Sequence, residues 1–320
     1  MKNLNGRNNS ILFEKDGVLF IKKQIIGDAE DVQRRYTNLL YWDNILRSNR
    51  EIHSPLIEYK DDNSHTIIYK WLEGAENLQD KITNSSCEDM AFYIYKAAEL
   101  MKKISKLSIE KARLEEKKHS NLISPIIALS EEKYVNSTGG ELELFAILQH
   151  DNQLKERIIN NKDSIISEGA KHGDLRLDQF VVTPDNKVWI IDFEELGYGN
   201  QLIDIAGILG SILFDSLYRT FSSIDGDNIS ETEINKHFMN NGEKNLRSIQ
   251  PIMRKVYHIY KNNDDFLEAR EISKLIGSFL IERVMSRAQF TFRLSDIDKA
   301  IAGVGRQAIL YPDSVLELLL

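Results

Sequence analysis

Short apolar segments separated by polar turns occupy the first part of the chain and predict antiparallel strands. Residues 10–15 and 18–23 flank the dipeptide Asp16-Gly17, which is typical of a type I′ hairpin turn. Residues 54–74 have the same character, with a polar turn at 61–63. The pattern therefore predicts a small antiparallel sheet made of two hairpins.

Between these hairpins, the apolar residues of segment 27–46 recur at helical spacing. Asp28 can cap a helix here, and Glu30 and Asp31 in its first turn suit the helix dipole. We expect one buried helical face, formed by Val32, Tyr36, Leu39, Leu40 and Leu46.

From residue 75 onward the pattern is mainly helical. Segments 88–108, 141–161, 202–221, 271–290 and 296–310 predict helices, 112–142 predicts a connection with short helices, and 222–245 predicts a polar insertion. The change of character near residues 72–74 predicts two lobes, 1–72 and 73–320, and a cleft between lobes is a favoured place for a ligand.

Composition narrows the class of protein. The 320 residues are 42% hydrophobic with a net charge of -8, which favours a globular protein and argues against a nucleic-acid partner bound through phosphate neutralisation. A single cysteine, Cys87, excludes an internal disulfide and suits a reducing cytoplasm. The N-terminus lacks the apolar run of a signal peptide, and no stretch predicts a membrane span.

The most informative segment is 171–200, which reads KHGDLRLDQFVVTPDNKVWIIDFEELGYGN. Protein-kinase catalytic loops have the form H-R-D-x-x-x-x-N, followed by a strand pair and D-F-G. Here His172 and Asp174 are followed, five residues after the aspartate, by Gln179. Residues 180–182 and 188–191 then predict a hairpin that returns the chain and delivers Asp192 beside Gln179. Two carboxylates so placed suit phosphoryl transfer, one facing the acceptor and one facing a metal.

The stretches HGDLRLDQF, IIDFEELGYGN and DIAG resemble the aminoglycoside-phosphotransferase group of the protein-kinase-like superfamily, and the lobe order is similar over most of the chain. Within that group the chain resembles the kinase components of thioamitide and class V lanthipeptide biosynthesis, which work beside a separate lyase. The resemblance implies an α+β, bilobal protein-kinase-like fold. Its N-lobe would be small and β-rich with one long helix, and its C-lobe would be larger and mostly helical.

The resemblance also implies roles for the residues of the motif, with ATP and Mg²⁺ as cofactors. Asp174 would be the catalytic base and Asp192 the principal Mg²⁺ ligand. Gln179 stands where the family has a metal-binding asparagine and is one methylene longer, which leaves the number of metal ions open. His172 would support the loop, and Asp204 would fix its backbone.

Two further charged residues each have two interpretations. Arg176, two residues after Asp174, either contacts the transferred phosphate or forms a salt bridge within the loop. Glu194 either assists the metal or pairs with a basic residue.

In the N-lobe, the segment VLFIKK resembles the strand that carries the ATP-binding lysine. Lys22 is the predicted lysine, and alternation places Lys23 on the other face, although a lysine at a strand end is also an ordinary surface residue. The helix glutamate that pairs with this lysine in the family is not found at the expected position. The other candidate nucleotide contacts are Gly6 and Ser10 for the phosphates and Lys70 and Leu72 for adenine.

These features predict an ATP- and Mg²⁺-dependent kinase, and its acceptor stays open. A Ser or Thr of a ribosomally made precursor peptide is favoured, with phosphorylation followed by elimination on a partner lyase. The alternatives are a small-molecule hydroxyl, such as an aminoglycoside or another metabolite, and a nucleotide-binding pseudokinase scaffold.

Overall fold

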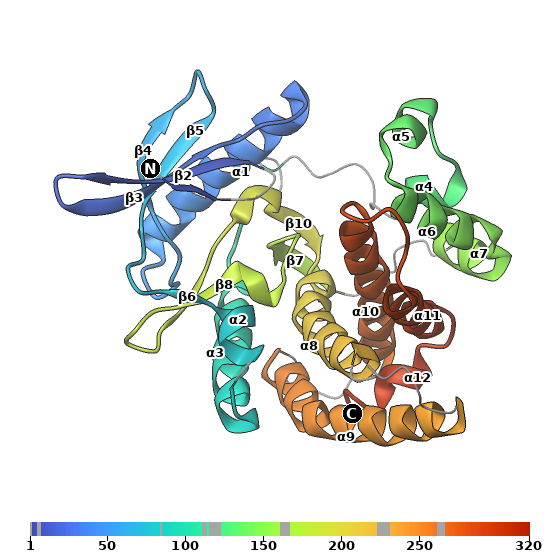
Figure 1. Ribbon diagram of the computed structural model, residues 1–320. Helices are drawn as coiled ribbons and strands as arrows, with labels where there is room; N and C mark the ends of the chain where they lie inside the picture. Colours follow the sequence, from blue (N-terminus) through green and yellow to red (C-terminus); the bar gives the residue numbers. More distant parts are fainter. Residues whose placement is uncertain are drawn as a thin grey trace. The chain divides into compact units, whose positions relative to one another are not determined.

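The computed structural model describes residues 2–4, 8–83, 85–110, 114, 123–160, 167–222, 231–260 and 266–320 (Figure 1). By compactness the chain forms two units. The first comprises residues 1–116 and 168–204, and the second comprises 117–167 and 205–320. These units differ from the predicted lobes, 1–72 and 73–320, and that boundary stays a prediction.

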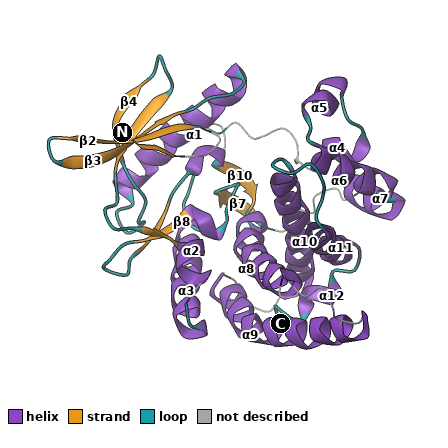
Figure 2. Cartoon of the chain, in the orientation of Figure 1, coloured by secondary structure: helices purple, strands orange, loops and turns teal. Residues whose placement is uncertain are grey.

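A five-stranded antiparallel sheet begins the first unit, in the order β1-β2-β3-β5-β4. Its strands β2, β3 and β4 are labelled in Figure 2. The predicted hairpin turn is confirmed, since Asp16 and Gly17 both have positive φ, of 54° and 74°, as a type I′ turn requires. The second predicted hairpin is also present. The strands are β1 (Lys2–Leu4), β2 (Asn9–Lys15), β3 (Val18–Gln24), β4 (Ile57–Asp61) and β5 (Thr66–Lys70).

The predicted helix between the hairpins is α1 (Ala29–Ser48), and Asp28 caps it by accepting hydrogen bonds from the Glu30 and Asp31 backbone amides. Its buried residues include most of the predicted apolar face. They also include three polar side chains that the apolar pattern does not predict, Arg34, Arg35 and Asn38.

The motif forms a hairpin in the first unit, as predicted. Strands β8 (Phe180–Val182) and β9 (Val188–Ile190) pair antiparallel, and β6 (Glu76–Asn77) extends them on the β8 side. A two-stranded sheet of β7 (Glu168–Lys171) and β10 (Gly197–Asn200) lies before and after the motif in sequence. The helices α2 (Leu78–Thr83) and α3 (Cys87–Ser105) complete this unit.

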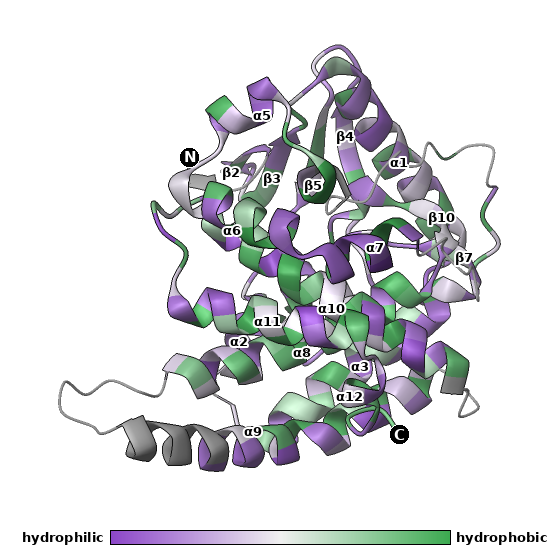
Figure 3. Cartoon of the chain, turned by 90° about the vertical axis from the view of Figure 1, so that its right-hand side faces the viewer, coloured by the Kyte–Doolittle hydropathy of each residue, from purple (hydrophilic) through white to green (hydrophobic). Residues whose placement is uncertain are grey.

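The second unit is helical. Its first helices are α4 (Ile123–Ile127), α5 (Glu131–Asn136), α6 (Gly139–His150) and α7 (Asn152–Asn160); α8 (Leu202–Ser222), α9 (Glu231–Tyr260), α10 (Phe266–Ala288), α11 (Asp296–Leu310) and α12 (Asp313–Leu316) follow. Figure 3 shows that hydrophobic residues are frequent in α8, α10 and α11. Close packing of α10 on α11 needs glycines, because a Cβ on Gly277 would lie 2.5 Å from the Gly305 carbonyl oxygen. None of the described helices is long and apolar enough to cross a membrane.

The predicted polar insertion at 222–245 is wrong over 231–245, which belong to α9. Pro251 lies inside this helix and suggests a break from sequence alone. The buried residues Ile249, Met253, Val256 and Tyr260 nevertheless have helical spacing, and this face stabilises the helix around the proline.

Candidate active site

The loop that carries Asp174 is held by hydrogen bonds to its backbone. The carboxylate of Asp204, 1% exposed, accepts hydrogen bonds from the His172 amide at 2.6 Å and the Gly173 amide at 3.0 Å. Gly173 has φ +87°, and a Cβ there would lie 2.3 Å from the Glu195 carbonyl oxygen. Asp204 therefore fixes the loop backbone, as predicted, and glycine is required beside the candidate base.

His172 and Phe193 connect this loop to the segment after β9. His172 is fully buried, and its Nε2 is 3.0 Å from the Ile191 carbonyl oxygen. The Phe193 ring lies 4.5 Å from the His172 ring and 3.7 Å from the Trp42 ring of α1, centroid to centroid. His172 is thus a structural support, which agrees with its predicted role.

Asp174 is partly buried and is paired with Arg176. Its side chain is 53% exposed, and the Arg176 Nη1 lies 3.1 Å and 3.2 Å from its two oxygens. Arg176 Nε also donates to Asp178 at 2.8 Å. Burial by the surrounding protein raises the pKa of Asp174 above its ordinary value, although Arg176 and His172 oppose the shift. Arg176 therefore forms the salt bridge within the loop, which was one of the two roles predicted for it. Its contact with a transferred phosphate stays a prediction.

Asp192 lies beside Gln179, as the hairpin predicts. The Ile191 amide donates to the Gln179 carbonyl oxygen at 2.9 Å, and Gln179 is 7% exposed. Asp192 adopts φ +71°, a strained conformation for an aspartate that is often found at functional sites. Burial opposes ionisation of Asp192, but Lys23, His172 and Arg176 together lower its pKa below the ordinary value.

The lysine that contacts Asp192 is Lys23 and not the predicted Lys22, which lies on the other face of β3. Lys23 Nζ binds the Asp192 carboxylate and lies 3.2 Å from Glu194 Oε2. The side chain of Lys22 is exposed. Alternation along β3 puts Lys23 on the face of Ile21 and Ile25, and Ile25 is 3% exposed. Ile25, just beyond the strand, is the sequence signal that identifies this face.

A buried polar cluster around Glu194 is the part of the site that sequence reasoning missed. Glu194 Oε2 accepts a hydrogen bond from Asn8 Nδ2 at 2.8 Å and lies 3.5 Å from Arg35 Nη1. The Asn38 side chain donates to the Glu194 carbonyl oxygen at 3.1 Å. Glu194 therefore pairs with basic residues, one of its two predicted interpretations. Asn8 and α1 are far from the motif in sequence, so only the polar residues on an otherwise apolar helix face hint at the contact.

The other predicted nucleotide contacts are placed as follows. Ser10 lies in β2 directly opposite Lys23 of β3 and is half-buried. Lys70 is exposed at the end of β5, and the carbonyl oxygen of the half-buried Leu72 accepts a hydrogen bond from the Ala75 amide. Gly6 lies outside the described residues. Their predicted contacts with phosphate and adenine stay predictions.

The donor set around Asp192 suits magnesium. Mg²⁺ prefers oxygen ligands and is usually held by one or two carboxylates together with substrate phosphates and water. Asp192 and Gln179 offer a carboxylate and an amide oxygen. Among the residues described, no group of three or more His, Cys, Asp or Glu side chains is arranged to hold a metal ion, and the assignment of Asp192 and Gln179 as metal ligands stays a prediction.

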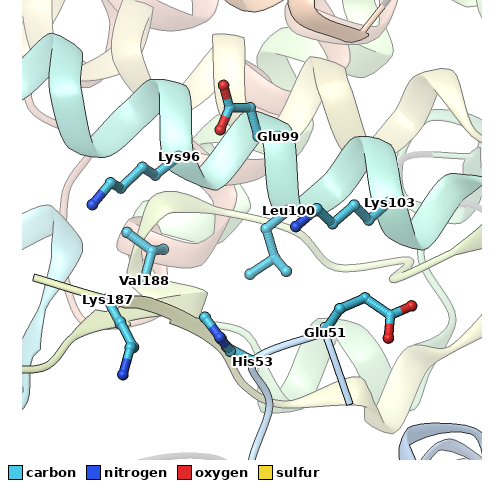
Figure 4. Close-up of a pocket in the computed structure, with 8 residues that line it drawn as sticks. All are labelled: Glu51, His53, Lys96, Glu99, Leu100, Lys103, Lys187 and Val188. Atoms are coloured by element: carbon cyan, nitrogen blue, oxygen red, sulfur yellow. The ribbon is translucent and has the colours of Figure 1, made fainter. Parts of the chain in front are cut away.

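A pocket of about 180 Å³ lies elsewhere in the first unit (Figure 4). Its lining includes Lys96, Lys103 and Lys187 together with Glu51 and Glu99. None of the motif carboxylates lines it, and its charges are mixed. The pocket therefore lies apart from the chemistry of the motif.

Comparison with known proteins places this site in a family. The profile of the phosphotransferase enzyme family matches residues 42–231, and no curated protein matches the sequence. Among solved structures, the choline kinase LicA from Streptococcus pneumoniae is similar, with a TM-score of 0.54 and 12% identity over 96% of this chain and 92% of that one. An aminoglycoside 2′-phosphotransferase-IIIa solved with GDP has a TM-score of 0.57 and 14% identity over 98% and 91%.

The ethanolamine kinase of Plasmodium vivax is also similar, with a TM-score of 0.53 and 14% identity over 98% of this chain and 81% of that one. At such identities these structures establish the fold, which is the predicted α+β, protein-kinase-like fold. The family match spans more than half of the sequence and includes Asp174, Gln179 and Asp192, and on this basis the chain belongs to the phosphotransferase enzyme family.

Proposed function

We propose that this phosphotransferase moves the γ-phosphate of ATP to a hydroxyl group, with Mg²⁺ as cofactor. The observation that carries the proposal is the placement of Asp174 and Asp192 on either side of one hairpin, with Lys23 bound to Asp192. Structural neighbours solved with AMP and with GDP support a nucleotide ligand. The retention of both carboxylates and of the lysine favours catalysis over a pseudokinase scaffold.

Asp174 is the residue best placed to accept the hydroxyl proton. It is exposed to an incoming acceptor, and its raised pKa brings its basicity closer to that needed for proton transfer near neutral pH. Arg176 neutralises it until an acceptor arrives. Since Asp178 holds the other edge of the guanidinium, Arg176 can exchange its contact with Asp174 for a phosphate oxygen without leaving the loop.

On the nucleotide side, Lys23 supplies a cation for the phosphates, and Asp192 with Gln179 would hold Mg²⁺. The metal would neutralise phosphate charge when bound. Burial normally favours the neutral form of a lysine, but Asp192 and Glu194 overcome it and raise the pKa of Lys23. The ammonium is therefore charged at neutral pH, as phosphate binding requires.

Two acceptor classes have support. A Ser or Thr of a precursor peptide, phosphorylated before elimination by a partner lyase, is supported by the sequence resemblance of the catalytic loop and by Arg176. A small-molecule hydroxyl is supported by the choline, ethanolamine and aminoglycoside kinases among the structural neighbours.

Mass spectrometry of acceptors incubated with enzyme, ATP and Mg²⁺ tests the proposal. Candidate precursor peptides, with and without a lyase, are compared with choline, ethanolamine and aminoglycosides. Wild type and the control variant Asp185→Asn, which changes an exposed carboxylate at the hairpin turn, should add one phosphate to the same acceptor, and Asp174→Asn should not. Binding of ATP without consumption in the presence of every acceptor would favour the pseudokinase alternative.

A further inference from the structure

The helix beside the catalytic lysine has an unusual charge pattern. In α1 the residues facing the site are the cations Arg34 and Arg35 rather than a glutamate. Asp31, a carboxylate in the first turn, binds these two arginines at 2.7 Å and 2.9 Å. Asp43 accepts hydrogen bonds from Arg47 and the Ile57 amide. The two carboxylates that contact Lys23, those of Asp192 and Glu194, both lie in the segment after β9.

Glu194 is the second carboxylate that contacts Lys23. Its Oε2 is 3.2 Å from Lys23 Nζ, and its side chain is 10% exposed. The same oxygen accepts the hydrogen bond from Asn8 and faces Arg35, and Asn38 holds the Glu194 backbone. The carboxylate is thus held by Asn8, just before β2, and by Arg35 of α1. Its buried surroundings screen its charge only weakly.

Arg35 links α1 to Glu194, with 3.5 Å between its Nη1 and Glu194 Oε2. It is fully buried, and its guanidinium also donates to the Ile26 carbonyl oxygen at 2.6 Å, to Asn8 Oδ1 at 2.9 Å and to Asp31. Because all three guanidinium nitrogens donate hydrogen bonds, Arg35 has little freedom to move. A displacement of α1 would then displace Glu194, which is the second carboxylate that contacts Lys23.

Contact with two carboxylates would keep Lys23 paired even when one of them binds a second cation. In the free protein Asp192 and Glu194 share Lys23. A divalent cation recruited by Asp192 would weaken its hold on the lysine, because the carboxylate would then serve two cations. Glu194 would remain to keep Lys23 extended toward the phosphates.

We propose that Glu194 is the positioning carboxylate of Lys23, supplied by the segment after Asp192 instead of by α1, and that α1 acts on the lysine through Arg35 and Glu194. This inference rests on the proposed phosphotransferase function. The alternative role for Glu194 is direct ligation of magnesium.

The test compares Glu194→Gln, which keeps the size and loses the charge, with Glu194→Asp and with the control Glu195→Gln. Glu195 is the neighbouring glutamate, and it pairs with Arg34 at 2.8 Å. Three quantities are measured: the acylation rate of the Lys23 amine by mass spectrometry without nucleotide, kcat and KM for ATP, and the Mg²⁺ concentration for half-maximal rate. Circular dichroism confirms folding. If Glu194→Gln does not fold, Glu194→Asp is the perturbation, because its side chain is one methylene shorter and withdraws the carboxylate from Lys23.

We expect Glu194→Gln to raise the acylation rate of Lys23 several-fold and to lower kcat by about 10²-fold, since misplacing a catalytic group by about 1 Å costs that much. Its Mg²⁺ half-saturation should match wild type, Glu194→Asp should recover part of kcat, and Glu195→Gln should leave Lys23 acylation unchanged. A shifted Mg²⁺ requirement with unchanged acylation would assign Glu194 to the metal and overturn the proposal, as would unchanged acylation and kcat together. If wild type fails to transfer phosphate, the proposed function fails, while the acylation rates still decide whether Glu194 holds Lys23.

Discussion

Lys23 and Lys22 are adjacent in β3 but differ completely in surroundings, which makes them a matched pair for mutation. The Lys23 side chain is 14% exposed and contacts two carboxylates, whereas Lys22 is exposed. We predict that Lys23→Met abolishes most phosphate transfer and that Lys22→Met does not.

The magnitude follows from what each change removes. Loss of one preorganised charge that stabilises the transition state typically costs about 10²–10³ in kcat, or about 2.7–4 kcal/mol. Lys23→Met should also destabilise the fold by less than the ~3–5 kcal/mol typical of a broken buried ion pair, because Glu194 keeps Asn8 and Arg35. Lys22→Met removes an exposed charge, and we expect a change in unfolding free energy within about 0.5 kcal/mol.

The assay is the initial rate of ATP-dependent phosphorylation of an established acceptor, with urea titration to follow unfolding. Normal turnover in Lys23→Met with loss in Lys22→Met would identify Lys22 as the catalytic lysine. Normal turnover in both variants would refute a catalytic lysine on β3.

Three further predictions concern the motif. Gln179→Asn should keep measurable activity because it keeps the amide oxygen, whereas Gln179→Leu should lose Mg²⁺-dependent rate; equal rates in Mg²⁺ titrations would remove Gln179 from the metal site. Gly173→Ala should lose most activity, because the new Cβ would lie 2.3 Å from the Glu195 carbonyl oxygen. Gly17→Ala, with nothing within 4 Å of its Cβ, should show only the strain of its positive φ of 74°, a loss of about 1–2 kcal/mol of unfolding free energy in a urea titration. An equal loss of activity in both variants would contradict the packing argument. Because Asp174 must be ionised to act as base and its pKa is raised, kcat/KM should fall with decreasing pH at a value above the ordinary aspartate pKa of about 3.9, and an acid limb at or below that value would argue against Asp174 as the base.

Local patterns predicted the elements whose signals are short-range. The positive-φ turn at Asp16-Gly17, the Asp28 cap and the β8–β9 hairpin each depend on residues close together in the chain. The hairpin in turn brings Gln179 next to Ile191 and Asp192, so their proximity was predictable from the order of the segments.

The remaining features depend on contacts between distant segments. Glu194 meets Asn8 across 186 residues and Arg35 across 159, and spacing carries no information about such pairs. The choice between Lys22 and Lys23 was predictable in principle, because Ile25 continues the buried face. The apolar run of β3 ends at Ile21 and by itself favours Lys22, whereas the buried Ile25 just beyond the strand favours Lys23.

In the proposed function two carboxylates have separate roles: Asp174 would accept the hydroxyl proton, and Asp192 would hold the nucleotide through magnesium. The most direct test is to measure Mg²⁺-dependent ATP binding and single-turnover phosphate transfer in Asp174→Asn and Asp192→Asn. We predict that Asp174→Asn binds ATP within a few-fold of wild type and fails to transfer phosphate, and that Asp192→Asn loses both the Mg²⁺-dependent part of binding and the transfer. Phosphate transfer at the wild-type rate in either variant would contradict the account.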